Sequence, residues 1–132
     1  MDLTEAKEIL GKISRQEREK LLTNIKRITF DFKINKSFLK YPAHPITIPR
    51  EFYIFLDIHG IIEKQDATVV FPDGSSALGY IYHGTAGWGE FYQIKIRSSY
   101  SGIGIGELKV GDLIKVEIYK VEEKTRIELT RQ

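Results

Sequence analysis

The hydrophobic residues near the start of the chain recur at the spacing of a helix. Between Leu3 and Ile28 most of them lie three or four residues apart, which places them on one helical face. Gly11 is suited to end a first helix, and residues 14–17 read as a capping box that begins a second one. The pattern therefore predicts an N-terminal helical segment over residues 1–27.

Beyond this segment the alternation changes to that of strands. In residues 28–34 every second side chain is apolar, which predicts a half-buried strand. Further strands are predicted over 46–48, 67–71, 77–82, 91–96, 113–119 and 126–129, with a short helix from Arg50 to Ile58. Loops are expected between them, including residues 35–45 and 83–89. About seven short strands with few helical turns predict a mainly β domain, a closed or nearly closed barrel over residues 28–132.

Composition limits the chemistry that the chain can carry. Its 132 residues include no cysteine, which excludes disulfides, thiolate zinc sites and cysteine nucleophiles. No apolar run approaches the ~20 residues of a membrane helix, and residues 1–10 lack the basic head and apolar run of a secretory signal. We therefore expect a cytoplasmic protein with no membrane partner.

The charge is unevenly distributed along the chain. The formal net charge of +2 comes from 20 basic and 18 acidic side chains. Residues 1–40 hold ten Lys or Arg against six Asp or Glu, so the basic excess lies in the first third. A solvated helix face accounts for much of this excess, and a nucleic-acid patch is the alternative.

One pattern imitates a metal-dependent nuclease. Pro72-Asp73 followed by Gln93-Ile94-Lys95 has the layout PD…(D/E)xK, in which two carboxylates hold a divalent cation. Gln93 replaces the second acid, Glu90 is the nearby acid that could substitute for it, and turn formation explains Asp73 in its Pro-Asp-Gly context. We therefore predict that the protein is not an enzyme, with no catalytic residue and no cofactor.

The histidines and the glycine-rich stretch carry no recognisable site. His44, His59 and His83 lack the spacing of metal ligands, so each is predicted at the surface or in a turn and no metal site is expected. Residues 102–106 alternate glycine with isoleucine, but they lack the strand-turn-helix context of a dinucleotide-binding motif. They are predicted to form a flexible loop.

Three segments, taken in order, match a known pattern. Residues 46–52 read Ile-Thr-Ile-Pro-Arg-Glu-Phe, residues 87–91 read Gly-Trp-Gly-Glu-Phe, and residues 108–114 read Leu-Lys-Val-Gly-Asp-Leu-Ile. They resemble the "IPK-F", "GW-x-x-F" and "L-x-x-GD-x-V" elements of the DNA-binding pseudobarrel. Plant B-three transcription-factor domains and recognition domains of some restriction endonucleases have this fold. The resemblance covers about residues 28–129 and implies a seven-stranded open pseudobarrel with short helices.

In that family two arms project from the barrel and grip the DNA major groove. The resemblance places the first arm at residues 35–44 and the second at residues 82–89. It implies that Trp88 packs in the core, with stacking on a ligand as the alternative. Lysines of the first arm could bind phosphates, and polar side chains of both arms could bind base edges or backbone. The implied DNA contacts are Lys33, Asn35, Lys36, Ser37, Lys40, Tyr82, His83 and Thr85, with Arg97 as a further phosphate ligand.

These observations lead to one main hypothesis and two others. The main one is a nonenzymatic domain that binds double-stranded DNA, either as a small regulator or as the recognition part of a restriction system with a nuclease or methyltransferase partner. The second is a barrel that binds a small molecule, a carbohydrate or a protein through aromatic residues of its loops, namely Phe38, Tyr41, Tyr82, Trp88 and Tyr100. The third, a metal-dependent nuclease, depends on Asp73, Glu90 and Lys95.

Overall fold

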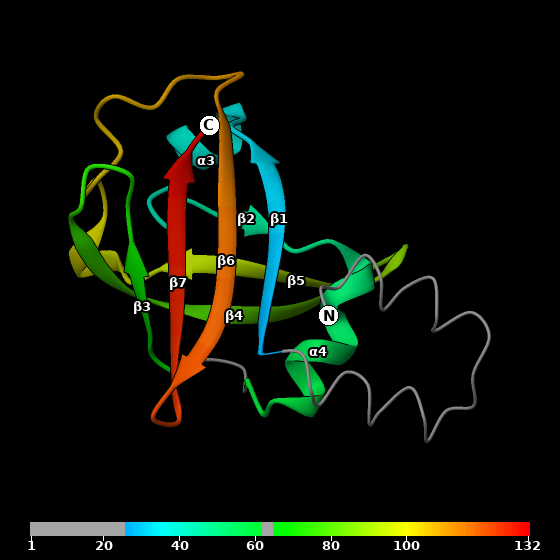
Figure 1. Ribbon diagram of the computed structural model, residues 1–132. Coiled ribbons are helices and arrows are strands. Elements are labelled where there is room, and N and C mark those ends of the chain that lie inside the picture. The colour runs from blue at the N-terminus through cyan, green and yellow to red at the C-terminus, as the bar shows by residue number, and fades with distance from the viewer. Residues whose placement is uncertain (1–25, 62–64) are drawn as a thin grey trace.

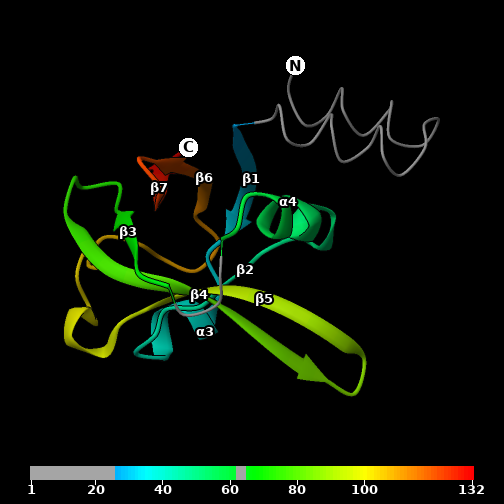
Figure 2. The same ribbon diagram turned by 90° about the horizontal axis from the view of Figure 1, so that it is seen from below.

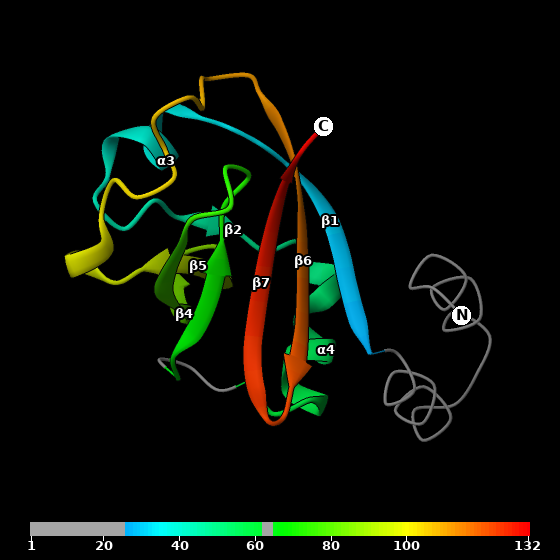
Figure 3. The ribbon, with the colours of Figure 1, turned by 60° about the vertical axis from the view of Figure 1, so that its left-hand side comes forward.

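The computed structural model describes residues 26–61 and 65–132, so the predicted helices before residue 26 lie outside the described part of the chain. The fold is mainly β, as predicted, and its sheet curls into a nearly closed barrel (Figure 1 and Figure 3). The strands are β1 (Arg27–Lys33), β2 (Ile46–Thr47), β3 (Ala67–Val70), β4 (Ser76–Ala86), β5 (Gly89–Ile96), β6 (Leu113–Val121) and β7 (Lys124–Arg131). The helical elements are α3 (Lys36–Lys40), η1 (Arg50–Phe52), α4 (Tyr53–Ile58) and η2 (Ser98–Tyr100).

The seven strands form one mixed sheet in the order β1-β6-β7-β3-β4-β5-β2. All neighbours are antiparallel except β3 and β7, which run parallel. β1, near the start of the described chain, thus pairs with β6, and β6 pairs with β7 at its end. Among the described residues, no helix combines the length and the apolar character needed to cross a membrane.

The core is built from the alternating faces that the sequence predicts. In β1 the residues Ile28, Phe30 and Phe32 are buried and their neighbours are exposed. Every second residue is buried in the same way from Ile114 to Ile118 of β6 and from Thr125 to Leu129 of β7. Burial of each large apolar side chain stabilises the fold by about 1.5–3 kcal/mol, so these strands supply much of the driving force for folding.

The helix after β2 lies where the sequence places it. Pro49 lacks an N–H for the sheet and has the φ of a helix start, so the chain leaves β2 and enters η1 and then α4. Phe52 and Phe55 are buried, and the Phe52 ring stacks on Phe30 with centroids 5.6 Å apart. Gly60, with φ of 62°, follows the helix as expected for a left-handed cap.

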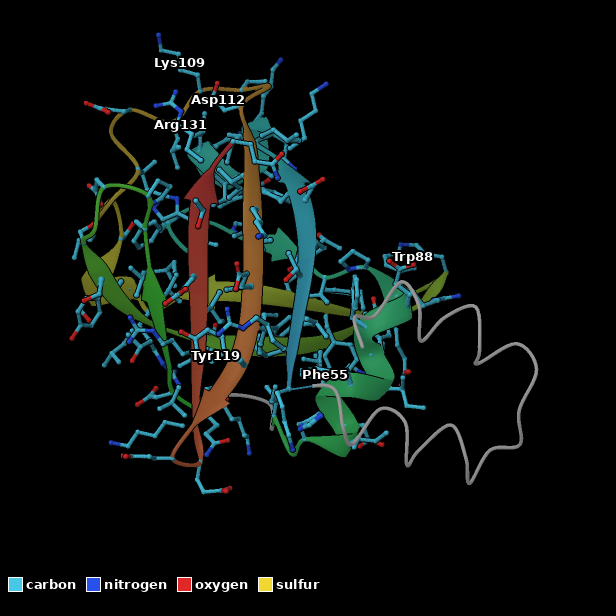
Figure 4. The ribbon with its side chains drawn as sticks, in the orientation of Figure 1. Phe55, Trp88, Lys109, Asp112, Tyr119 and Arg131 are labelled. Carbon is cyan, nitrogen blue, oxygen red and sulfur yellow. The ribbon has the colours of Figure 1, made fainter. Side chains whose placement is uncertain are left out.

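The turn into β6 is fixed by a carboxylate. Asp112 Oδ2 accepts hydrogen bonds from the backbone N–H of Lys109 at 2.9 Å and from Arg131 Nη2 at 3.1 Å (Figure 4). Gly111 has φ of 94°, a conformation that favours glycine. The Gly-Asp pair therefore serves the turn before the strand, in agreement with the predicted strand entry.

Two predictions about loops are wrong. Residues 35–45 contain the helix α3, and residues 83–89 belong mostly to β4 and β5. The Asn35 side chain accepts a hydrogen bond from the backbone N–H of Phe38 and so caps α3. Glycines in the second segment conceal the alternation of a strand, because they lack a side chain that marks a face.

His44 and the glycine-rich loop also differ from the prediction. His44 ends a turn, since its backbone N–H donates to the Tyr41 carbonyl oxygen, but it is only 5% exposed and therefore not a surface histidine. Its Nε2 accepts a hydrogen bond from the backbone N–H of Gly102 at 3.0 Å, and its Nδ1 lies 2.7 Å from the carbonyl oxygen of Phe38. The proton must therefore be on Nδ1. The ring joins α3 to the loop at 102–106, whose Ile103 and Ile105 pack against the core, so this loop is anchored rather than free.

Glu128 on β7 gives the fold an acid-sensitive contact. Its Oε1 accepts hydrogen bonds from Tyr119 Oη at 2.8 Å and from Arg126 Nε at 3.1 Å. Both hydrogen bonds lower the pKa of Glu128 below its ordinary value of 4.5, and the bond from Tyr119 has the larger effect. A carboxyl whose pKa is lower in the folded state stabilises the fold above its unfolded pKa, and this contribution is lost as the pH falls through the folded pKa.

We therefore expect the free energy of unfolding of Glu128→Gln to depend less on pH in the acid range than that of the wild type. Urea unfolding at neutral pH and at several pH values below 4.5 should show a smaller loss of unfolding free energy in the variant than in the wild type. Glu123→Gln, at an exposed position of the β6–β7 turn, is the control and should follow the wild type. Parallel curves for wild type and Glu128→Gln would contradict this role.

Candidate nucleic-acid interface

The β4–β5 hairpin projects beyond the barrel (Figure 2). Its pairs run from Gly79 opposite Ile96 to Ala86 opposite Gly89, and Gly87 and Trp88 form the turn. Directly opposite residues of an antiparallel pair share one face of the sheet. The hairpin therefore has an inner face that continues the barrel interior and an outer face that points away from it.

The inner face is covered near the base of the hairpin. Tyr92 packs edge-on against Tyr53 of α4, with ring centroids 4.6 Å apart, and stacks on His83 at 4.5 Å. The His83 Nε2 lies 3.4 Å from Glu90 Oε1, an ion pair only when the ring is protonated. Tyr92 thus lies between the hairpin and α4, and His83 stacks on it, while Glu90 beside His83 is largely exposed.

The outer face carries aromatic rings with cations above them. Tyr80 lies opposite Lys95, Tyr82 opposite Gln93, and Gly84 opposite Phe91. Lys95 Nζ lies 3.9 Å from the centroid of the Tyr82 ring, a short cation–π distance. None of the helices described in residues 26–61 and 65–132 covers this face in the views of Figure 2 and Figure 3.

Arg97 continues this row but is already paired. Its guanidinium lies 4.4 Å from the Tyr80 ring centroid, and its Nη2 and Nε contact Asp66 Oδ1 at 2.9 and 3.1 Å. The predicted phosphate ligand is therefore held in place by an aromatic ring and a carboxylate. Its charge is partly compensated by Asp66, so Lys95 is the stronger cation of the outer face.

The prediction that Trp88 packs in the core is wrong. Trp88 is 69% exposed and lies at the turn of the hairpin (Figure 4). A two-residue turn at the end of a projecting hairpin has no protein interior beside it, so its side chain has no core to enter. The indole contacts Phe91, with ring centroids 5.6 Å apart.

The first predicted arm is a short, anchored helix. Phe38 is buried and fixes α3 to the barrel, while Lys36, Ser37 and Lys40 are exposed on it. Lys33, at the end of β1, is exposed beside them. Within residues 26–61 and 65–132, no carboxylate forms an ion pair with these three lysines.

The structure brings some of the predicted site residues together and separates others. α3 and the hairpin lie on the same side of the barrel, away from β6 (Figure 2 and Figure 3). This side carries α3, with Lys36 and Lys40, and the hairpin, with Tyr82 on its outer face, whereas Lys33 of β1 lies opposite Leu113 of β6. His83 and Thr85 lie on the inner face, opposite to Tyr82.

The sequence analysis did not predict several residues of this surface as DNA contacts, among them Gln93 opposite Tyr82. Tyr80, Phe91 and Lys95 lie on the outer face, and Arg50 lies beside the tip, because a Cβ built on Gly89 would be 3.4 Å from Arg50 Nη2. Continuing the alternation of β4 through Gly84 would have placed the first three on one face. No sequence signal connects Arg50 with the tip, since that contact depends on how η1 packs.

The residues of the nuclease-like pattern lie in different surroundings. Asp73 Oδ1 accepts hydrogen bonds from the Ser75 hydroxyl at 2.5 Å and its backbone N–H at 2.9 Å, which lower the pKa of Asp73 and support the turn. Glu90 and Lys95 lie on opposite faces of the hairpin. In the described part of the chain, no three His, Asp or Glu side chains are grouped so as to hold a metal ion.

Two shallow hollows bear on the hypothesis of a small-molecule site. One, of about 360 Å³, lies between the β3–β4 turn and the loop at 104–108. The other, of about 480 Å³, lies around Asp66, Leu78 and Lys124. The loop aromatics proposed for such a site line neither hollow, and Phe38 is part of the core.

Comparison of the chain with protein-family models and with curated proteins finds no match. What the protein binds must therefore be inferred from α3 and the hairpin themselves.

Proposed function

We propose that the protein binds double-stranded DNA, with the outer face of the β4–β5 hairpin in the major groove. The observation that carries this proposal is the outer face of the hairpin, where Lys95 lies over Tyr82. The hairpin itself lies on the same side of the barrel as α3 (Figure 2). A two-stranded β-ribbon fits the major groove, which is about 12 Å wide. The duplex would lie between the hairpin and α3.

The lysines near α3 suit the phosphate backbone. Lys33, Lys36 and Lys40 are exposed, and such cations gain affinity by releasing counterions from DNA. Ser37 can donate a hydrogen bond to a phosphate. Asn35 uses its Oδ1 as the cap of α3, which leaves its amide group for a backbone contact rather than a bidentate base contact.

The hairpin suits the base edges and the adjoining phosphates. Tyr82 and Gln93 are opposite each other on the outer face, and both can hydrogen-bond base edges. Lys95 adds a cation next to them. His83 and Thr85 lie on the inner face, so this proposal assigns the groove contacts to Tyr82, Gln93 and Lys95 instead.

A salt titration of duplex binding tests the proposal. We expect the affinity for a randomised duplex of about 20 base pairs, measured by fluorescence anisotropy, to fall as salt rises, with a log-log slope of about −0.9 per phosphate contact. Lys95→Ala should reduce the slope by about one, and the double variant Lys36→Ala/Lys40→Ala by about two.

Lys124→Ala is the control for a lost surface charge, because this lysine is exposed at the start of β7. It lies near Leu78 at the foot of β4 and outside the row of Tyr82, Gln93 and Lys95. Its slope should equal that of the wild type. No salt-dependent binding at micromolar protein, or equal effects of Lys95→Ala and Lys124→Ala, would overturn the proposal.

A further inference from the structure

The tip of the hairpin holds an aromatic residue that the fold does not require. Trp88 occupies a tight turn, a position where small or polar residues are usual. Its indole is mostly exposed, so it contributes little to the core. A large exposed aromatic ring at a projecting tip is accessible to a ligand.

Phe91 packs against the indole ring of Trp88 and supports it. Phe91 contacts the indole of Trp88 with ring centroids 5.6 Å apart, and Phe91 in turn contacts Tyr82 at 5.9 Å. Gly84 makes room for this arrangement, since a Cβ there would lie 2.4 Å from Phe91 Cζ. Phe91 is thus seated over the backbone of Gly84, and the row from Tyr82 to Trp88 is a prearranged aromatic surface.

Cations lie on both sides of this aromatic surface. Arg50 lies next to Gly89 at the tip, and Lys95 lies over Tyr82 toward the base. In residues 26–61 and 65–132, no ion pair of either cation with a carboxylate is found. A ligand with a flat π face flanked by negative charges would match this surface.

We infer that Trp88, supported by Phe91, stacks on a single unpaired nucleobase of duplex DNA, while Arg50 and Lys95 bind the flanking phosphates. This inference rests on the proposed DNA binding and deepens it, because it names the kind of duplex that is preferred. A nucleotide offers both the π face and the adjoining negative charges, and aromatic stacking accepts any base. Bases within a perfect duplex are stacked on one another and present only their edges in the major groove.

The test compares two duplexes that differ by one nucleotide. A fully paired duplex of about 20 base pairs and the same duplex with one bulged adenine are titrated by anisotropy. The wild type should bind the bulged duplex about 5- to 150-fold more tightly, the range that base stacking on an aromatic side chain supplies. Trp88→Ala should bring the two affinities together, and Trp88→Phe should keep part of the difference.

The chain itself provides a second readout, because Trp88 is its single tryptophan. Its intrinsic fluorescence should be quenched by the bulged duplex and much less by the paired one. Val121→Ala is the control for a lost apolar side chain at a turn, since Val121 is also exposed and precedes the β6–β7 turn. It should leave both affinities unchanged.

The outcomes separate this inference from the function on which it rests. Salt-dependent binding of both duplexes with equal affinity, and equal quenching by both, would overturn the unpaired-base inference and leave DNA binding intact. An equal loss on both duplexes in Trp88→Ala would assign the indole to paired DNA and also overturn it. Absence of binding to either duplex would overturn the proposed function itself.

Discussion

Gly104→Ala should lower the free energy of unfolding by about 2–5 kcal/mol. The residue has φ of 72°, where a Cβ costs about 1–2 kcal/mol. A Cβ at this position would also lie 2.2 Å from Cγ and 2.5 Å from Cβ of Phe71. Phe71 is buried, so it cannot move away without disturbing the core, and such overpacking costs about 1–3 kcal/mol. Urea unfolding followed by circular dichroism measures the loss.

Alanine substitutions at two other glycines of this loop separate the cost of the backbone conformation from the cost of packing against Phe71. Gly102 has φ of 86° with nothing near its Cβ position, so Gly102→Ala should show the backbone cost alone. Gly106 has open space and no positive φ, so Gly106→Ala should be close to neutral. If all three variants unfold at the same urea concentration, Gly104 is not packed closely against Phe71.

The strands of the barrel could be predicted because one face of each is buried. The alternation of Ile28, Phe30 and Phe32 reports the burial of β1 directly. Pro49 and the Gly111-Asp112 pair act locally, through the φ of proline and through a carboxylate that caps a turn, so they too could be identified without a structure.

The candidate site could be predicted only in part, because its geometry depends on tertiary packing. His44 is six residues from Phe38 but 58 from Gly102, and no local pattern predicts that it bonds to both. Residues 91–96 are predicted as a strand, but the glycines between it and residues 77–82 conceal its register, so no local pattern places Phe91 and Lys95 on one face with Tyr82. The exposure of Trp88 follows from the projection of the hairpin beyond the barrel, which is not encoded in the turn alone.

Phe38→Ala should destabilise the fold about as much as Gly104→Ala, lowering the free energy of unfolding by about 3–5 kcal/mol. Phe38 is 1% exposed, and its ring contacts Phe32 and His44 with centroids 5.7 Å from each. Removing the ring leaves a cavity between α3 and β1, and an α3 of five residues has too few internal hydrogen bonds to hold its place alone. The loss is measured by urea unfolding.

Tyr41→Ala provides a matched control, because it removes an aromatic ring from the same segment at a position that is 51% exposed. It should change the free energy of unfolding by no more than about 0.5 kcal/mol. In the duplex titration, Phe38→Ala should also weaken binding at temperatures where it is folded, because Lys36 and Lys40 lose their fixed position on α3. A Phe38→Ala protein as stable as Tyr41→Ala would show that α3 is not anchored by this ring, and the lysines would then have no fixed position from which to meet the phosphates.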